Sequence, residues 1–296
     1  MRKISFVSLL FPLLIACGAG RSAADGPGVK NLDIAKLAEH IRESYSIPPF
    51  VKIDVTEPRD SGIPGMVAYT VVFQAGMGTQ KQTLQVSENG RHYFLGEFKD
   101  LQFDAVADRL SKMQLKEAPV RGPKSASIDV VQFTDFQCPF CQRGYSIMAQ
   151  SIMKEFDGKV RWYYKSLPLV RIHPWAKPAA IAAMCAGKQG SDQFWSLHDK
   201  MFEAQREINV SNFEEKLDGF AKGSSLKMKD FQACVNGKKT EATVDSDMAE
   251  ADLLKIESTP AFLVNGRLVS GADLDGLKAA IESELKKTGG DIPEKK

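Results

Sequence analysis

Two cysteines separated by Pro139 and Phe140 are the residues of this 296-residue chain whose spacing most directly predicts chemistry. Their segment, TDFQCPFCQRG, follows an apolar run and precedes a helix-like stretch, which places Cys138 at the N-terminus of the expected helix. Unpaired N–H groups and the helix dipole favour a negative charge there, so the thiolate of Cys138 should be stabilised. Cys141 follows one helical turn later, within reach of a mixed disulfide formed on Cys138. The motif therefore predicts a pair of thiols that exchange disulfides.

Two other interpretations of this motif compete with thiol exchange. A structural zinc site needs four ligands, usually from a second C-x-x-C or a spaced histidine pair. Neither is present, because the histidines are scattered at His40, His92, His173 and His198. An inert structural bridge is the other alternative, which we disfavour because cysteines at this spacing usually serve catalysis. We therefore expect no metal ion and no other cofactor.

The first residues are typical of an export signal. Two basic residues precede an apolar run over residues 4–16, which is too short to span a bilayer but suits a signal-peptide core. The sequence LIAC resembles a bacterial lipobox, which implies lipidation of Cys17 and an anchor region over residues 1–24. Cleavage after Ala24, at a small-residue site, is the alternative that would release the protein. Both interpretations predict a periplasmic or cell-envelope protein.

Composition narrows the class of protein further. Hydrophobic residues make up 43% of the chain and charged residues 26%, as expected for a soluble globular protein of one large or two ordinary domains. The formal charge is +2, and it disappears once Arg2 and Lys3 are removed with the signal. No basic face for nucleic acid is therefore implied.

The number of cysteines is consistent with export. Lipidation of Cys17 would account for the odd one among five. In an oxidising compartment the other four should form two bridges, and spacing favours Cys138 with Cys141 and Cys185 with Cys234 among three connectivities. We expect the second bridge to be structural, with a second redox pair or free thiols as alternatives.

Two regions follow the signal. Residues 25–115 predict a small α+β domain, with one helix and an Asn89–Gly90 hairpin signal. Residues 116–126 carry two prolines and a glycine without apolar periodicity, which predicts a linker. The β-rich segments of the domain are residues 51–55, 66–73, 81–86 and 92–96.

The second region, residues 127–290, begins as a βαβ unit. The order strand, helix, strand predicts a parallel pair of strands: residues 128–133, the cysteine motif with its helix, and residues 160–165. Helical runs then form an insertion over about residues 174–250. A hairpin around Asn265–Gly266 and a final helix complete the region.

The order of four motifs resembles the thioredoxin fold in its DsbA-like form over about residues 120–288: FTDFQCPFC, HPWAKPAAIAAMCA, QFWSLHDKMF and STPAFLVNGRLVSGA. The resemblance implies an α/β thioredoxin fold with a helical insertion, preceded by the small α+β domain. It also implies that Cys138 attacks, that Cys141 resolves, and that a cis Pro260 with Thr259 faces them to position substrate.

By the same resemblance the protein is a thiol-disulfide oxidoreductase that serves exported cysteine-containing proteins and is reset by a membrane redox partner. Pro139 and Phe140 join the substrate-positioning residues. Phe140 replaces the histidine usual in DsbA, and a neutral ring adds no charge to hold the thiolate, so we predict a weaker oxidant. Thr259 instead resembles the isomerases DsbC and DsbG. Oxidation, reduction and isomerisation therefore stay open.

The segments SGIPGM and VSENGRHYFLGEFKDL resemble the dimerisation domain of DsbC-type isomerases. This likeness implies a homodimer and makes a dimeric isomerase or reductase the alternative function. A non-catalytic thioredoxin-fold chaperone or metal-delivery module is a further alternative. His173, which precedes Pro174, is expected to enter a helix or to pack rather than to transfer protons.

Overall fold

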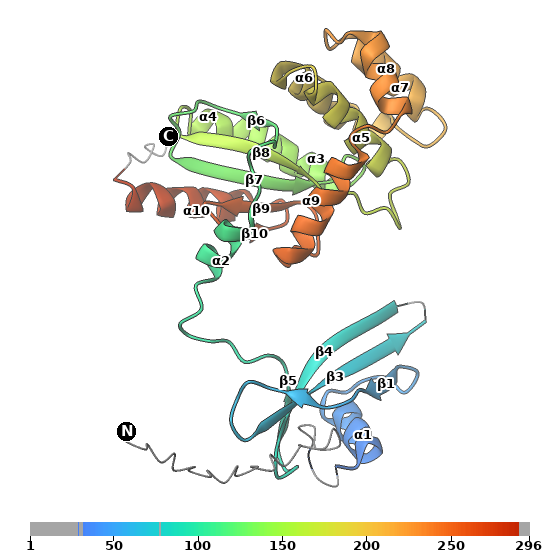
Figure 1. Cartoon of the computed structure of the whole chain (residues 1–296), viewed down its shortest axis with the longest axis vertical. Helices are drawn as coiled ribbons and strands as arrows, with labels where there is room; N and C mark the ends of the chain where they lie inside the picture. Colours follow the sequence, from blue (N-terminus) through green and yellow to red (C-terminus); the bar gives the residue numbers. More distant parts are fainter. Residues whose placement is uncertain (1–28, 30–31, 77, 290–296) are drawn as a thin grey trace, which may run out of the picture. The chain divides into compact units, whose positions relative to one another are not determined.

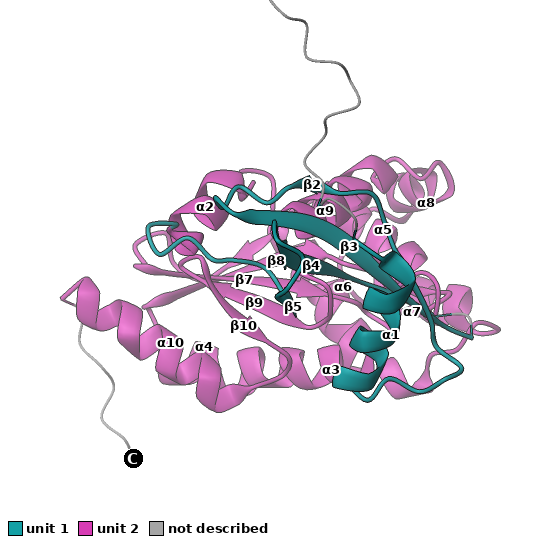
Figure 2. Cartoon of the chain, turned by 90° about the horizontal axis from the view of Figure 1, so that it is seen from below, with its two compact units in different colours: residues 1–103 teal, residues 104–296 magenta. Residues whose placement is uncertain are grey.

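The computed structural model describes residues 29, 32–76 and 78–289 (Figure 1). The expected signal and anchor region, with Cys17 and Ala24, lies outside the described residues. Within the described ranges, no helix combines the length and apolar content that a membrane span requires. The chain forms two compact units, residues 1–103 and 104–296 (Figure 2).

The first unit packs one helix on an antiparallel sheet. Asp33 caps the helix by accepting a hydrogen bond from the Lys36 amide. Leu37 and Ile41 of this helix belong to one buried apolar cluster with residues of the sheet. The elements are α1 (Ile34–Ser44), β1 (Lys52–Val55), β2 (Arg59–Asp60), β3 (Met66–Ala75), β4 (Gly78–Ser87) and β5 (Tyr93–Leu95), with strand order β1-β3-β4-β5 and β2 beside β3.

The second unit is built on a mixed sheet with strand order β10-β9-β7-β8-β6. The expected βαβ unit is present, because β7 and β8 are parallel neighbours. The expected terminal hairpin is present as β9 and β10, and β9 runs antiparallel to β7. The strands are β6 (Val120–Arg121), β7 (Ile128–Thr134), β8 (Val160–Ser166), β9 (Ala261–Val264) and β10 (Arg267–Ser270).

Helices flank this sheet and form the insertion between β8 and β9. The insertion helices gather beside one end of the sheet (Figure 1). They are α5 (Ala176–Gly187), α6 (Ser191–Glu203), η2 (Gln205–Glu207), α7 (Phe213–Lys222), α8 (Met228–Asn236) and α9 (Glu241–Leu253). The other helices are α2 (Ala105–Lys112), α3 (Pro139–Ser146), the π-helical turn η1 (Ile147–Ile152), α4 (Met153–Glu155) and α10 (Leu274–Lys287).

The segment expected to be a linker differs from that prediction. Residues 116–126 include β6, whose Val120 pairs with Tyr163 of β8, and the Tyr164 amide donates to the Pro119 carbonyl. The chain instead divides between residues 103 and 104. A two-residue strand held by main-chain pairing carries no apolar periodicity, so its sequence reads as a loop.

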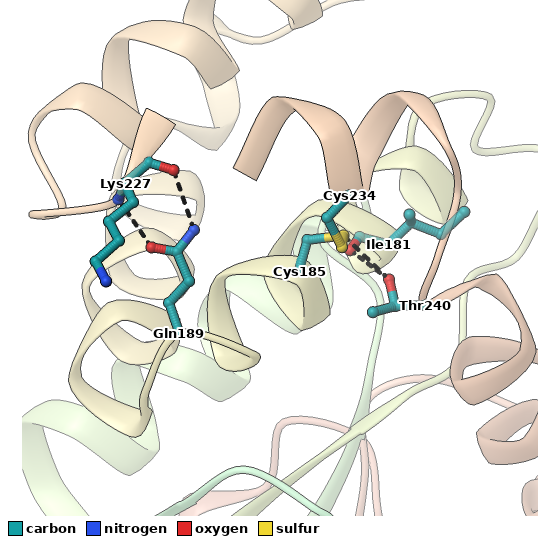
Figure 3. Close-up of a disulfide and its surroundings, with 6 residues drawn as sticks. All are labelled: Ile181, Cys185, Gln189, Lys227, Cys234 and Thr240. Atoms are coloured by element: carbon teal, nitrogen blue, oxygen red, sulfur yellow. Dashed lines mark hydrogen bonds between the residues drawn. A yellow bond between two sulfur atoms is a disulfide. The ribbon is translucent and has the colours of Figure 1, made fainter. Parts of the chain in front are cut away.

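A disulfide joins Cys185 of α5 to Cys234 of α8 within the insertion (Figure 3). This is the pairing that the spacing favoured. The Thr240 hydroxyl lies 3.5 Å from the Cys185 sulfur and donates to the Ile181 carbonyl at 2.8 Å. The bridge therefore lies in a packed and hydrogen-bonded part of the insertion.

Candidate active site

The CPFC motif forms the junction between β7 and α3. Cys138 is the N-cap residue, with extended backbone angles, and Pro139 is the first residue of the helix. Proline suits this position because its fixed φ is helical and its missing N–H would have no helical partner there. The Cys141 amide donates to the Cys138 carbonyl at 3.0 Å, which closes the first turn. Cys138 therefore lies at the leading end of a helix, as its sequence position predicted.

Both sulfurs of this motif are free thiols, so the structure describes the reduced form of the pair. The bridge expected between Cys138 and Cys141 is not formed in it. A hydrogen bond from the Cys141 thiol is the main cause that lowers the pKa of Cys138 to about 6, against the opposing effect of burial. Main-chain hydrogen bonds from Cys141 and Phe140 lower it further. Burial is the main cause that raises the pKa of Cys141. One sulfur is thus prepared to ionise while the other keeps its proton.

Thr259 and Pro260 face the two sulfurs across the site. Their peptide bond is cis, and the Cys138 thiol donates to the Thr259 carbonyl at 3.8 Å. The Thr259 hydroxyl is buried without a partner of ordinary geometry among the described residues, yet it lies near enough to both sulfurs to lower their pKa values. A β-carbon added to Gly144 would lie 3.1 Å from the Pro260 ring, so the glycine lets α3 approach this turn closely.

A family model described as thioredoxin matches residues 114–283. The chain belongs to the thioredoxin family. Disulfide bond formation protein D of Bacillus subtilis (strain 168) is 31% identical over 186 residues, which cover 62% of this chain and 82% of that protein. The crystal structure of oxidised BdbD from Bacillus subtilis matches with a TM-score of 0.54 and 28% identity, over 58% of this chain and 95% of that one. The DsbA-like thioredoxin fold with a helical insertion is therefore confirmed.

Other relatives of this thioredoxin-family chain are longer proteins. The Na(+)/H(+) antiporter NhaA 1 of Salinispora arenicola is 33% identical over 181 residues, which cover 61% of this chain but only 26% of the antiporter. The chain thus spans about a quarter of such a relative. The family match begins at residue 114, so the likeness of the first unit to a DsbC-type dimerisation domain stays a prediction.

Three glutamines position the thioredoxin-family motif, and sequence reasoning did not identify them. Gln205 donates from its side chain to the carbonyls of Phe136 and Cys138, at 2.8 and 2.9 Å. Gln142 donates to the carbonyl of Phe202. Gln137 accepts a hydrogen bond from the main-chain amide of Trp175. These side chains attach the motif to the helical insertion, which fixes where the two sulfurs lie.

Phe136 and Phe140 flank the motif but lie in different environments. Phe140 is 67% exposed beside Cys138 and gives the site an apolar rim. Phe136 is fully buried and contacts the ring of His198. Seven aromatic rings surround His198, with centroids between 4.8 and 5.7 Å away: Phe136, Tyr145, Trp162, Tyr164, Phe194, Trp195 and Phe202. The thioredoxin-family motif therefore rests on an aromatic core.

Metal ligands do not cluster in the part of the chain that the structure describes, where no three histidine, cysteine, aspartate or glutamate side chains come together to hold an ion. The motif itself supplies two candidate ligands, the sulfurs of Cys138 and Cys141. Their arrangement, with one ionising thiol and one protonated thiol a helical turn apart, suits nucleophilic exchange between sulfur atoms.

Proposed function

We propose that the protein is a thiol-disulfide oxidoreductase in which Cys138 is the attacking thiol and Cys141 the resolving thiol. The observation that carries this proposal is the position of Cys138 at the N-terminus of α3, facing the Thr259 carbonyl, with Cys141 one turn behind it. These surroundings lower the pKa of Cys138 to about 6 and raise that of Cys141. The attacking sulfur must be a thiolate, whereas the resolving sulfur must wait until a mixed disulfide has formed.

The reaction follows from this arrangement. The Cys138 thiolate attacks one sulfur of a partner disulfide, an S–S bond forms to Cys138, and the partner's other sulfur leaves as a thiolate. Cys141 then loses its proton and attacks the Cys138 sulfur, which releases the second partner thiol and leaves a Cys138–Cys141 bridge. Two electrons have passed from this protein to the partner. The reverse sequence donates the bridge to a reduced partner.

The surroundings supply a place for an extended partner chain. Thr259 and Pro260 face Cys138, and the exposed Phe140 ring and Pro139 border the same approach. We propose that these four residues position substrate. The likeness to a protein named for disulfide bond formation favours bridge donation to exported, cysteine-containing proteins of the cell envelope. A membrane redox partner would then reset the pair, and lipidated Cys17 would keep the protein at the membrane.

A dimeric isomerase or reductase is the second candidate. Thr259 beside Pro260 favours it, as does a first unit that packs a helix on an antiparallel sheet. A weakly oxidising reduction potential together with a dimeric mass would support this candidate. A strongly oxidising monomer would support bridge donation.

Trapping of mixed disulfides tests the proposed chemistry itself. Cys141→Ser, mixed with glutathione disulfide, should hold one glutathione on Cys138, because the resolving sulfur is absent. Cys138→Ser should hold none, and mass spectrometry distinguishes the two. A variant with both Cys185→Ala and Cys234→Ala is the matched control, which should exchange as the unchanged protein does. Equal adducts on both single variants, or none on Cys141→Ser, would refute the proposal.

A further inference from the structure

A buried carboxylate lies at the base of the CPFC motif. The side chain of Asp135, which follows β7, is fully buried. One of its oxygens accepts hydrogen bonds from the amides of Gln137 and Cys138, at 2.7 and 3.2 Å. The other accepts from the Leu169 amide at 2.8 Å and lies 2.7 Å from Nδ1 of His173. This carboxylate therefore holds together the turn that leads into α3 and the segment that follows β8.

The same residue lies close to both sulfurs. Its main-chain amide donates to the Cys141 sulfur at 3.4 Å, and its main-chain carbonyl accepts from the Cys138 amide at 3.2 Å. A carboxylate oxygen of Asp135 accepts a hydrogen bond from the Cys138 amide. The covalent geometry of Cys138 therefore keeps this oxygen within about 7 Å of the Cys138 sulfur. At that distance a buried negative charge opposes a thiolate and would raise the pKa of Cys138 by about one unit if nothing offset it.

His173 is the ionisable side chain that contacts this carboxylate. Its ring points its Nδ1 at the carboxylate and remains 15% exposed, so it faces both the buried oxygen and the solvent. Among the described residues no lysine or arginine forms an ion pair with this carboxylate, and the nearby groups Cys138, Cys141 and Tyr164 are not cationic. Within the described residues, His173 is thus the side chain that donates to Asp135. The expected helix-entry role is also present, since the His173 carbonyl accepts from the Ala176 amide.

We propose that Asp135 and His173 form a charge-compensating pair that sets how readily Cys138 ionises. Asp135 is needed as the acceptor that folds the turn, and His173 offsets the cost that its negative charge imposes on the neighbouring thiolate. Both residues act through Cys138 and are therefore positioning residues. The inference deepens the proposed function and rests on Cys138 being the attacking thiol.

Opposite charge changes give a test that a merely structural role would not satisfy. The readout is the pKa of Cys138, measured from the pH dependence of iodoacetamide alkylation and assigned to the residue by mass spectrometry. Asp135→Asn keeps an oxygen for the amides of Gln137 and Cys138 but removes the charge, so the pKa should fall by about one unit. His173→Gln leaves the carboxylate less compensated, so the pKa should rise by about one unit.

Two further variants complete the design. His173→Lys places a permanent cation at this position and should return the pKa of Cys138 toward its original value. His92→Gln, which changes an exposed histidine of the first unit, is the matched control and should leave it unchanged. If Asp135→Asn does not fold, His173→Gln and His173→Lys still decide the outcome, because the His173 ring is partly exposed.

The results separate the inference from the proposed function. A rise in His173→Gln that His173→Lys reverses supports the charge-compensating pair. Shifts of Asp135→Asn and His173→Gln in the same direction, or no shift in His173→Gln, overturn it and leave a structural role. The glutathione adduct on Cys138 in Cys141→Ser is measured independently, so its absence would refute the proposed function while leaving the pKa result valid.

Discussion

The second unit holds two pairs of cysteines whose fates differ, although their exposure does not. We call Cys138 and Cys141 the motif pair, and Cys185 and Cys234 the insertion pair. Cys138 is 5% exposed and Cys234 is 6% exposed, so access to solvent does not distinguish the two pairs. The motif pair is a dithiol in which one pKa is lowered and the other is raised, whereas the insertion pair is a disulfide between two helices.

The difference lies in the hydrogen-bond donors around each sulfur. Cys138 is at a helix N-terminus, where the main-chain amides of Phe140 and Cys141 and the Cys141 thiol all stabilise its thiolate. Cys185 and Cys234 lie inside α5 and α8, where main-chain amides already bond within the helix. A buried sulfur therefore becomes reactive through the hydrogen-bond donors around it, not through exposure.

Removing each pair should have opposite consequences, and this is the largest effect we expect. Cys138→Ala should abolish disulfide exchange and change the free energy of unfolding by no more than about 1 kcal/mol. Joint Cys185→Ala and Cys234→Ala should leave exchange intact but lower the free energy of unfolding by up to about 4 kcal/mol, because the two cysteines lie 49 positions apart in the chain. Insulin reduction and urea unfolding measure the two quantities. Loss of exchange in the folded double variant would show that the insertion pair also takes part in the chemistry.

The thiols of the motif pair should themselves differ in reactivity. With the pKa of Cys138 lowered to about 6 and that of Cys141 raised, most Cys138 and very little Cys141 is thiolate at neutral pH. Iodoacetamide should therefore modify Cys138 about 100-fold faster than Cys141 at pH 7. The Cys138 rate should fall as the pH drops through about 6.

Peptide mapping after timed alkylation checks this result. The insertion pair serves as the internal control, because its sulfurs should resist labelling until a strong reductant is added. Equal rates at Cys138 and Cys141 would show that the helix terminus and its donors do not make the pKa values of the two thiols differ.

Local features of the motif pair could be predicted from the sequence, because they depend on neighbouring residues. Pro139 after Cys138 indicates the start of a helix, and a short apolar run before it indicates a strand. The meeting of this helix with Pro260 came from the resemblance to a known fold. No pattern of spacing brings residues that far apart in the chain together.

The supporting contacts could not be predicted, since each depends on tertiary structure. Gln205 reaches the carbonyl of Cys138 from 67 residues away, and single glutamines carry no periodicity or motif. Asp135 stands beside the motif, but its partner His173 is 38 residues distant. The strand β6 was missed because two residues are too few to show alternation.

His198 is a buried titratable side chain in the second unit, which also holds both cysteine pairs. Its Nδ1 contacts Asp199, but its Nε2 has no partner among the described residues, and burial lowers its pKa from 6.5. Because the folded pKa lies below the unfolded one, the unfolded chain binds more protons between the two values. The contribution of neutral His198 to the free energy of unfolding is therefore fully present above pH 6.5. It should fall on acidification by up to about 1.4 kcal/mol per pH unit.

Urea unfolding between pH 5 and about 7.5 tests this contribution. His198→Phe places a ring that suits the surrounding aromatic core and removes the titrating group, so its stability should decline less as the pH falls. His92→Gln, at an exposed position of the first unit, should decline as the unchanged protein does. An identical decline in His198→Phe would mean that His198 does not carry this pH dependence.

The smallest expected effects come from two threonines, one beside each pair. Thr259→Val removes a hydroxyl that stabilises the Cys138 thiolate but makes no hydrogen bond of ordinary geometry. In this variant the alkylation rate of Cys138 at pH 6 should fall about 2-fold to 3-fold, and the free energy of unfolding should not decrease. Thr240→Val instead removes the hydrogen bond to the Ile181 carbonyl, so it should lower the free energy of unfolding by about 1 kcal/mol.

Both substitutions replace a threonine hydroxyl with a methyl group, so the two variants differ only in the surroundings of that group. Thr240→Val should leave the reactivity of Cys138 unchanged, because its hydroxyl serves the insertion pair. If Thr259→Val lowered stability and Thr240→Val slowed alkylation, the division into a chemical pair and a structural pair would be wrong. The expected pattern would show that a threonine hydroxyl affects reactivity only where it lies beside a sulfur that ionises, since a hydroxyl stabilises a charge only where one develops.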